Sequence, residues 1–197
     1  FGPMPGGIKQ HPFNQVDGLK KIINKNTAAV VIELIQGEAG IVPAKKVFIN
    51  EIKRLCRKNN ALIVIDEVQS GVGRTGHLYA YEKYDIKPDI LCSAKGMGNG
   101  IPIGAILTTN KVAKAMQVGA HGSTYGGNPL ACSVSYEVFK EVSKKSFLNS
   151  VIKKEKLFIS LLNDLNKKYN CFTAVRSAGL WIGLELNSKI ENLTLQN

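Results

Sequence analysis

Continuous apolar runs, separated by polar segments that contain glycine, are the main pattern along this chain. Residues 28–35, 61–66, 90–94 and 103–109 are rich in β-branched and other apolar side chains, which is typical of strands buried in a sheet. Between the first two runs, residues 44–59 repeat apolar side chains at the spacing of an amphipathic helix. This order predicts a βαβ unit in a mostly parallel sheet that is buried on both faces.

The second half of the chain has a different pattern. Residues 129–169 favour a long helix, on which Leu157, Leu161 and Leu165 recur at helical spacing with lysines on the other side. Residues 172–186 return to the character of a strand. The pattern predicts a partial large domain in residues 1–134, connecting helices in residues 135–171, and the start of a small C-terminal α/β domain in residues 172–197.

The composition is that of an ordinary globular protein, with 44% hydrophobic residues and a mean hydropathy of −0.03. No apolar run reaches the roughly 18 residues of a membrane span, so we expect no membrane partner. The chain opens on Phe1 rather than Met, and residues 188–197 are polar and follow an apolar segment. We therefore expect this sequence to be a piece of a longer protein.

The net charge of +11 raises a non-enzymatic alternative, a basic protein that binds nucleic acid. However, the lysines are spread along the whole chain and alternate with glutamates, as in Glu137, Lys140, Glu141 and Lys144. No strip of the sequence mixes basic with aromatic residues. This distribution favours solvated surfaces, so we expect no nucleic-acid partner.

Four cysteines, Cys56, Cys92, Cys132 and Cys171, are the main candidates for metal or redox chemistry. None belongs to a C-x-x-C pair, and none has a histidine at the spacing of zinc ligands. We therefore expect no metal site. Free thiols are typical of the reducing cytoplasm, which is the predicted location.

Three polar residues stand at or just after the predicted strand ends: Glu38, Asp66 and Lys95. Ligands of open α/β sheets bind beyond the carboxyl ends of the strands. A carboxylate such as Asp66, at the end of an apolar run, needs a cation or hydrogen bonds, although a helix cap or a turn would also explain it.

Lys95 is followed by the glycine-rich segment 96–100, whose small residues let a bulky ligand approach closely. An exposed turn lysine is the alternative, but a partly desolvated lysine can form a Schiff base. Its pairing with Asp66 favours that chemistry. A carboxylate for a pyridinium nitrogen and a lysine for an aldehyde are the two polar anchors of pyridoxal phosphate.

Residues 121–129 form a third candidate, because hydroxyl groups and backbone N–H groups before a helix suit a phosphate. A capped loop without a ligand would have the same composition.

Five segments, taken together, resemble the class III aminotransferases in order and in spacing. They are residues 36–38, 65–76, 94–96, 102–105 and 122–131. Within that class the chain most resembles the bacterial acetylornithine aminotransferase subgroup, through its opening Phe-x-Pro and through residues 82–89 and 175–180. The resemblance covers nearly the whole chain. It implies an α/β fold of the fold-type I transferases that depend on pyridoxal 5′-phosphate (PLP).

The resemblance also implies roles in binding the cofactor. Lys95 would be the catalytic Schiff-base lysine and would move a proton between substrate and cofactor. Asp66 would keep the ring nitrogen protonated, Val68 would pack on the ring, and Gln69 would bond to the ring oxygen. Glu67 lies within the same expected cofactor-binding segment.

A homodimer with shared active sites is the assembly that the resemblance implies. Thr124 would reach a cofactor phosphate in the partner subunit, and Ser123 would contact substrate there. Glu38 would hold a substrate-binding arginine when the second substrate is absent. The family's N-terminal phosphate loop, ring-stacking aromatic residue and substrate arginines lie outside these 197 residues.

The implied reaction moves the terminal amino group of N2-acetylornithine to 2-oxoglutarate in arginine synthesis. N-succinyl-LL-2,6-diaminopimelate, in lysine synthesis, is a second expected donor. Ornithine aminotransferase and 4-aminobutyrate aminotransferase remain alternatives, because they share the same cofactor residues. Leu34, Ala39 and Ser177 depart from the family's usual residues, as does the glycine-rich segment 96–100, but none of these changes removes a chemical group from the mechanism.

Overall fold

The computed structural model describes residues 3–188 of the chain. The strands are β1 (Ala29–Ile32), β2 (Ile35–Gln36), β3 (Val42–Pro43), β4 (Leu62–Asp66), β5 (Ile90–Ser93), β6 (Ala105–Thr108), β7 (Phe172–Ser177) and β8 (Ile182–Leu186). The α-helices are α1 (Leu19–Ile22), α2 (Lys46–Asn59), α3 (Asn110–Ala113), α4 (Pro129–Val142) and α5 (Lys145–Tyr169), and the 3-10 helices are η1 (Ala80–Tyr84) and η2 (Lys95–Gly98).

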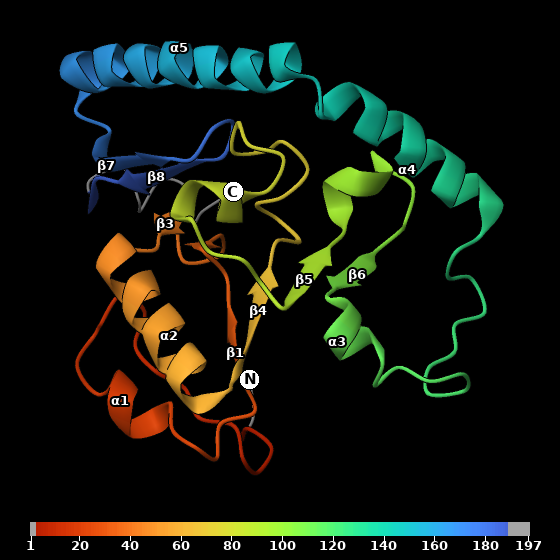
Figure 1. The fold of residues 1–197 in the computed structure, drawn as a ribbon. Coiled ribbons are helices and arrows are strands. Elements are labelled where there is room, and N and C mark those ends of the chain that lie inside the picture. Colours follow the sequence, from red (N-terminus) through yellow and green to blue (C-terminus); the bar gives the residue numbers. More distant parts are fainter. Residues whose placement is uncertain (1–2, 189–197) are drawn as a thin grey trace.

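A four-stranded sheet with the order β1-β4-β5-β6 forms the centre of the molecule (Figure 1). β1, β4 and β5 are parallel, whereas β6 runs antiparallel to β5. The mostly parallel sheet predicted from the sequence is therefore confirmed. β6 reverses direction because only η2 and a short turn join it to β5, and a parallel strand would need a longer crossover.

Helix α2 covers one face of the sheet and contributes one side of the main core. Its residues Phe48, Ile49, Ile52 and Leu55 are buried, in one cluster with Ile65 of β4 and other sheet residues. Burying such side chains is worth about 1.5–3 kcal/mol each, which fixes α2 against the strands.

The sequence predicted a sheet buried on both faces, and this is wrong for β1 in the described part of the chain. Val31 is 72% exposed, whereas its neighbour Ile32 is buried in the cluster that contains α2. Successive side chains of a strand point to opposite faces, and α2 covers only the face to which Ile32 points.

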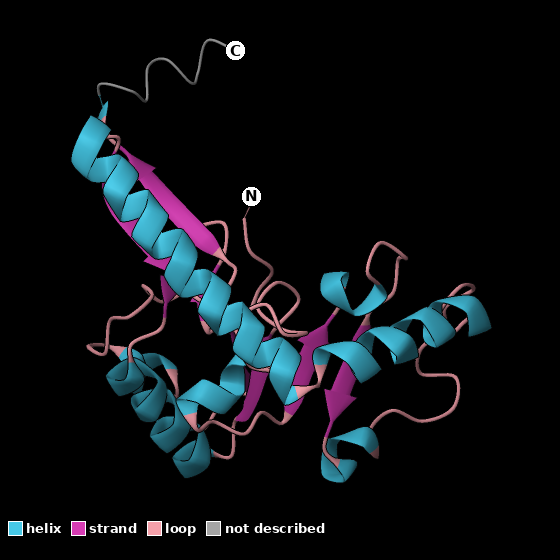
Figure 2. Cartoon of the chain, turned by 90° about the horizontal axis from the view of Figure 1, so that it is seen from above, coloured by secondary structure: helices cyan, strands magenta, loops and turns pink. Residues whose placement is uncertain are grey.

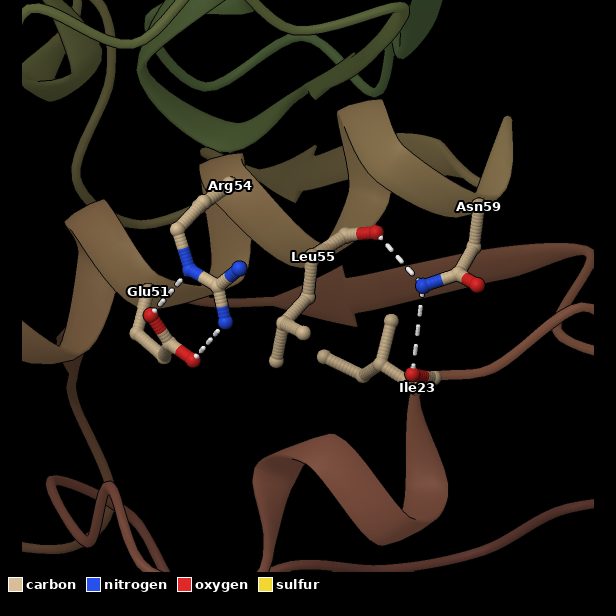
Figure 3. A network of polar contacts seen from close by, with 5 residues as sticks. All are labelled: Ile23, Glu51, Arg54, Leu55 and Asn59. Carbon is tan, nitrogen blue, oxygen red and sulfur yellow. Dashed lines mark hydrogen bonds and ion pairs between the residues drawn. The ribbon is translucent and has the colours of Figure 1, made fainter.

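The end of α2 is tied to α1 by a polar contact (Figure 3). The Asn59 amide nitrogen donates to the carbonyl oxygens of Leu55 and Ile23, at 2.9 and 3.3 Å. Glu51 and Arg54 form an ion pair on the same helix, one turn earlier. The hydrogen bond from Asn59 to the Ile23 carbonyl connects α2 with the end of α1, so it fixes the segment that leads into β1.

Two helices, α4 and α5, replace the single long helix that the sequence pattern favoured. The break lies at Ser143 and Lys144, where Lys144 takes an extended conformation with ψ 132°. α5 then runs above the hairpin formed by β7 and β8 (Figures 1 and 2). Periodicity alone did not reveal this break, because residues 130–169 contain neither proline nor glycine.

The segment 172–186 is an antiparallel hairpin rather than one strand, and its turn spans residues 178–181. The first predicted strand, residues 28–35, is also shorter, since β1 ends at Ile32. The predicted small domain in residues 172–197 lies partly outside the described residues, and its boundary stays a prediction.

Candidate active site

Asp66 is the last residue of β4, at the carboxyl edge of the sheet. Its Oδ1 accepts a hydrogen bond from the Val68 backbone N–H at 2.9 Å. In the parallel register Asp66 stands beside Cys92 of β5. Burial, and to a smaller extent the Asp66 charge, raise the pKa of the Cys92 thiol. The strand end and the turn that follows therefore orient this carboxylate.

Lys95 comes two residues after the end of β5, at the first position of η2. Its φ of 46° lies in the left-handed region, which is uncommon for residues other than glycine and often marks a functional position. The side chain is exposed, unlike the partly desolvated lysine that the sequence suggested. Gly96 and Gly98 carry no side chain that could cover it.

Asp66 and Lys95 thus follow the ends of neighbouring parallel strands, as expected, but their side chains line different cavities. Lys95 lines a cavity of about 570 Å³ together with Gln69 and Trp181. Asp66 lines a second cavity of about 1040 Å³, with Glu33 among its other residues. The structure therefore brings the two residues to one sheet edge and not into one pocket.

Gln69 and Glu38 come from different loops and meet at this edge. The Gln69 amide nitrogen donates to Glu38 Oε1 at 3.3 Å. The side chains of Gln69 and Trp181 both pack against Gly37. A Cβ atom at Gly37 would lie 2.6 Å from the Trp181 ring and 3.1 Å from the Gln69 amide. Only glycine leaves room for this packing, which joins the Glu38 loop to the wall of the cavity.

Trp181, the chain's single tryptophan, is a site residue that the sequence reasoning missed. It is the last residue of the turn between β7 and β8, and this turn is fixed to the loop after Gln69. The Leu180 N–H donates to the Arg74 carbonyl at 3.0 Å, and Arg74 Nη1 donates back to the Leu180 carbonyl at 3.1 Å. The hairpin thereby supplies part of the cavity wall beside Lys95.

Glu67 follows Asp66, and its side chain is fully buried. Both carboxylate oxygens accept hydrogen bonds within the protein, from Ser70 Oγ and from the backbone N–H groups of Ala80 and Tyr81. Burial raises the pKa of Glu67, and these hydrogen bonds act in the opposite direction. Its expected place in the cofactor-binding segment stays a prediction.

Ser123 and Thr124 lie on an exposed loop before α4 and are not brought to the cavity of Lys95. Ser123 Oγ accepts a hydrogen bond from the Gly126 N–H at 2.9 Å, which shapes the loop locally. Asn128 caps α4 by accepting from the Ala131 N–H. The predicted contacts of this loop with a partner subunit remain predictions.

The part of the chain that the structure describes holds no group of three or more His, Cys, Asp or Glu side chains arranged for a metal ion. Within the same residues, no helix is long and apolar enough to cross a membrane.

A mostly parallel sheet with a carboxylate and a lysine after neighbouring strands is the arrangement of a PLP-dependent transferase. Residues 5–196 match the family described as aminotransferase class-III. The chain therefore belongs to the class III aminotransferases, which are PLP-dependent enzymes, and the resemblance stated from its motifs is confirmed.

One curated relative, the acetylornithine/succinyldiaminopimelate aminotransferase of Buchnera aphidicola subsp. Schizaphis graminum (strain Sg), is 52% identical over 197 residues, which are 98% of this chain and 49% of the relative. The solved structure of acetylornithine aminotransferase from Elizabethkingia anophelis matches with a TM-score of 0.85 and 36% identity, over 94% of this chain and 48% of that one. Ornithine aminotransferase from Toxoplasma gondii, whose structure was described with partial occupancy of PLP at its active site, matches with a TM-score of 0.84 and 32% identity, over 96% of this chain and 45% of that one.

The chain spans about half the length of the curated relatives it matches. Taken one by one, the side chains at the sheet edge have the chemistry that PLP needs: an amine at Lys95 for the aldehyde, a carboxylate at Asp66 for the ring nitrogen and an amide at Gln69 for the ring oxygen, although Lys95 and Asp66 line different cavities. The tight packing of Gln69 and Trp181 around Gly37 gives the site one ordered wall.

Proposed function

We propose that the whole protein to which this chain belongs is a PLP-dependent aminotransferase that moves the terminal amino group of N2-acetylornithine to 2-oxoglutarate. The observation that carries this proposal is the placement of Asp66 and Lys95 after neighbouring parallel strands of a class III aminotransferase. The names of the acetylornithine aminotransferase relatives support the choice of substrate. Arginine synthesis would use this reaction.

We propose N-succinyl-LL-2,6-diaminopimelate, of lysine synthesis, as a second amino donor. We also propose the cytoplasm as the location of the protein, which its four free cysteines support.

Each residue at the sheet edge has a separate task in this proposal. When bound, PLP supplies an electron sink that stabilises the charge left on a substrate carbon after a proton departs. Lys95 Nζ would hold the cofactor at its aldehyde and, when free, would accept the proton from the substrate carbon and return it. Asp66 would keep a proton on the ring nitrogen through its negative charge, Val68 would pack on the ring, and Gln69 would bond to the ring oxygen.

Glu38 and Gln69 share a hydrogen bond, which links the Glu38 loop to the loop that carries Gln69. We propose that Glu38 pairs with a substrate-binding arginine of the whole protein when the second substrate is absent. Trp181 lines the same cavity as Lys95.

We further propose a homodimer in which Ser123 and Thr124 serve the partner's site. The same segment exposes large apolar side chains, among them Val118, Tyr125 and Leu130. Apolar groups gathered on one surface mark protein interfaces more often than free surface. Ser123 would contact substrate, and Thr124 would bond to a phosphate oxygen of the cofactor.

The substrate assignment is tested by comparing kcat/KM for N2-acetylornithine, ornithine and 4-aminobutyrate, each with 2-oxoglutarate as acceptor. The structure of an ornithine aminotransferase among the matches makes ornithine the relevant rival. We expect N2-acetylornithine to exceed ornithine by at least about 10-fold, since contacts with an added acyl group discriminate by about 1–3 kcal/mol. A preference for ornithine or 4-aminobutyrate would contradict the assignment.

A further inference from the structure

A buried polar network lies directly behind the segment that carries Asp66, Val68 and Gln69. Its centre is Glu67, which is 0% exposed. Glu67 Oε2 accepts from Ser70 Oγ at 2.9 Å and from the Ala80 N–H at 2.8 Å. Glu67 Oε1 accepts from the Tyr81 N–H at 2.7 Å. One side chain thus joins the end of β4 to the start of η1.

This carboxylate has no ion-pair partner among the residues that the structure describes. Burying a charged group without a cation is costly unless hydrogen bonds replace the water it loses. Here all three partners are donors, so the carboxylate fits as an acceptor and a neutral amide does not. Through these hydrogen bonds, the Glu67 side chain connects the segment after β4 with the first residues of η1.

A second buried contact extends the network to β5. Tyr79 Oη donates to Ser93 Oγ at 3.0 Å, and both residues are buried. Ser93 is the last residue of β5 and stands two positions before Lys95. Tyr79 is itself held against Gly71, where an added Cβ atom would lie 2.9 Å from its ring.

We propose that Glu67 and Tyr79 are positioning residues, which set the placement of the Asp66–Gln69 segment relative to Lys95 through this network. The inference rests on the proposed function and deepens it. Glu67 acts through its neighbours, since its side chain is fully buried and both oxygens accept hydrogen bonds inside the protein.

Glu67→Gln in the whole protein is the first test, because it keeps the size of the side chain and puts an N–H group where a carboxylate oxygen accepts. Glu82→Gln is the matched control. Glu82 is exposed and lies in η1, where it accepts a longer bond of 3.3 Å from the Tyr79 N–H and stands 3.9 Å from the His77 ring nitrogen. Tyr79→Phe and Ser93→Ala form a second, milder pair of variants that remove the other contact and leave Glu67 in place.

Three readouts separate positioning from simple destabilisation: the dissociation constant for PLP, the pH at which the absorbance bands of the bound cofactor interconvert, and the split between kcat and KM. Each is measured at a temperature where circular dichroism shows the variant folded. We expect the dissociation constant of Glu67→Gln to rise at least about 10-fold, from the loss of hydrogen bonds to a charged group. We also expect a displaced spectral transition and a fall in kcat that exceeds the change in KM for the amino donor.

For Tyr79→Phe and Ser93→Ala we expect the dissociation constant for PLP to rise about 2–10-fold. Because both changes remove the same contact, the double variant should have about the same dissociation constant as either single variant. Glu82→Gln should match the wild type in all three readouts. If Glu67→Gln fails to fold, the Tyr79 and Ser93 variants decide the question.

Folded Glu67→Gln or Tyr79→Phe protein with wild-type PLP affinity and an unchanged spectral transition would overturn the inference. The proposed function fails in a different way, through wild-type protein that neither binds PLP nor transaminates. The two failures are therefore distinguishable.

Discussion

Gly179 in the turn between β7 and β8 gives the sharpest test of how the hairpin reaches the site. Its φ is +64°, and a Cβ atom there would lie 2.4 Å from the Arg74 carbonyl oxygen and 2.6 Å from the Thr75 Cα. Both obstacles are backbone atoms, so they cannot rotate away. The Gly179 N–H also donates to Glu155 Oε1 at 2.9 Å, which holds the turn from the other side.

The expected cost of Gly179→Ala in the whole protein has two parts. The left-handed conformation costs a residue with a Cβ atom about 1–2 kcal/mol, and overpacking costs a further 1–3 kcal/mol or so. Reduced freedom of the unfolded chain offsets about 0.4–1 kcal/mol. We therefore expect the free energy of unfolding to fall by about 1–5 kcal/mol. Displacement of Trp181 should also raise KM for the amino donor.

Gly7→Ala is the matched control, because Gly7 has a φ of +88° and no atom within 4 Å of an added Cβ. Urea denaturation followed by circular dichroism gives the free energies, and steady-state kinetics gives KM. Gly179→Ala should lose clearly more stability than Gly7→Ala. Equal losses in the two variants, with KM unchanged, would refute the docking of the hairpin turn on the Arg74 loop.

Three further predictions concern charge and assembly. Asp66→Asn should keep the fold but lower kcat at least about 10-fold, since a charge-assisted hydrogen bond contributes about 1.5–3 kcal/mol; turnover near that of the wild type in stopped-flow assays would exclude the role. Mixing inactive Lys95→Ala and Thr124→Ala homodimers should restore activity once subunits exchange, whereas exchange shown by mass spectrometry without regained activity would mean self-contained sites. Burial raises the pKa of Glu67 above its ordinary value of 4.5, with the nearby Glu82 charge adding a smaller effect. The folded protein therefore keeps a proton that the unfolded chain releases, so the stabilisation is complete below the ordinary pKa and is lost as pH rises through the raised one. The free energy of unfolding of wild type minus that of Glu67→Gln should fall over that range in urea denaturation, and a constant or rising difference would contradict this sign.

The positions of Asp66 and Lys95 could be predicted because each follows a continuous apolar run, and the carboxyl ends of parallel strands share one edge of the sheet. The first apolar run, residues 28–35, predicted a strand that is longer than β1, which ends at Ile32. Leu34 is fully buried, yet its carbonyl accepts from the Ala44 N–H and from Tyr84 Oη rather than from a strand. Apolar character reports burial, and it does not say which partner a backbone group will find.

The walls of the site could not be predicted in the same way. Trp181 reaches the cavity through a hairpin that is distant in sequence from Gln69, and no local pattern encodes that contact. The buried acceptor role of Glu67 depends on Ala80 and Tyr81, which follow an irregular loop. Long-range docking of loops depends on close fit between backbones, as at Gly37, and periodicity carries no information on it.

The central claim is that Lys95 is the residue that carries the cofactor. Borohydride reduction of the whole protein with PLP, followed by proteolysis and mass spectrometry, tests it most directly, because reduction makes the link between lysine and cofactor permanent. The account predicts the pyridoxyl group on Lys95, at the start of η2. A pyridoxyl group found on any other lysine, with Lys95 unmodified, would contradict it.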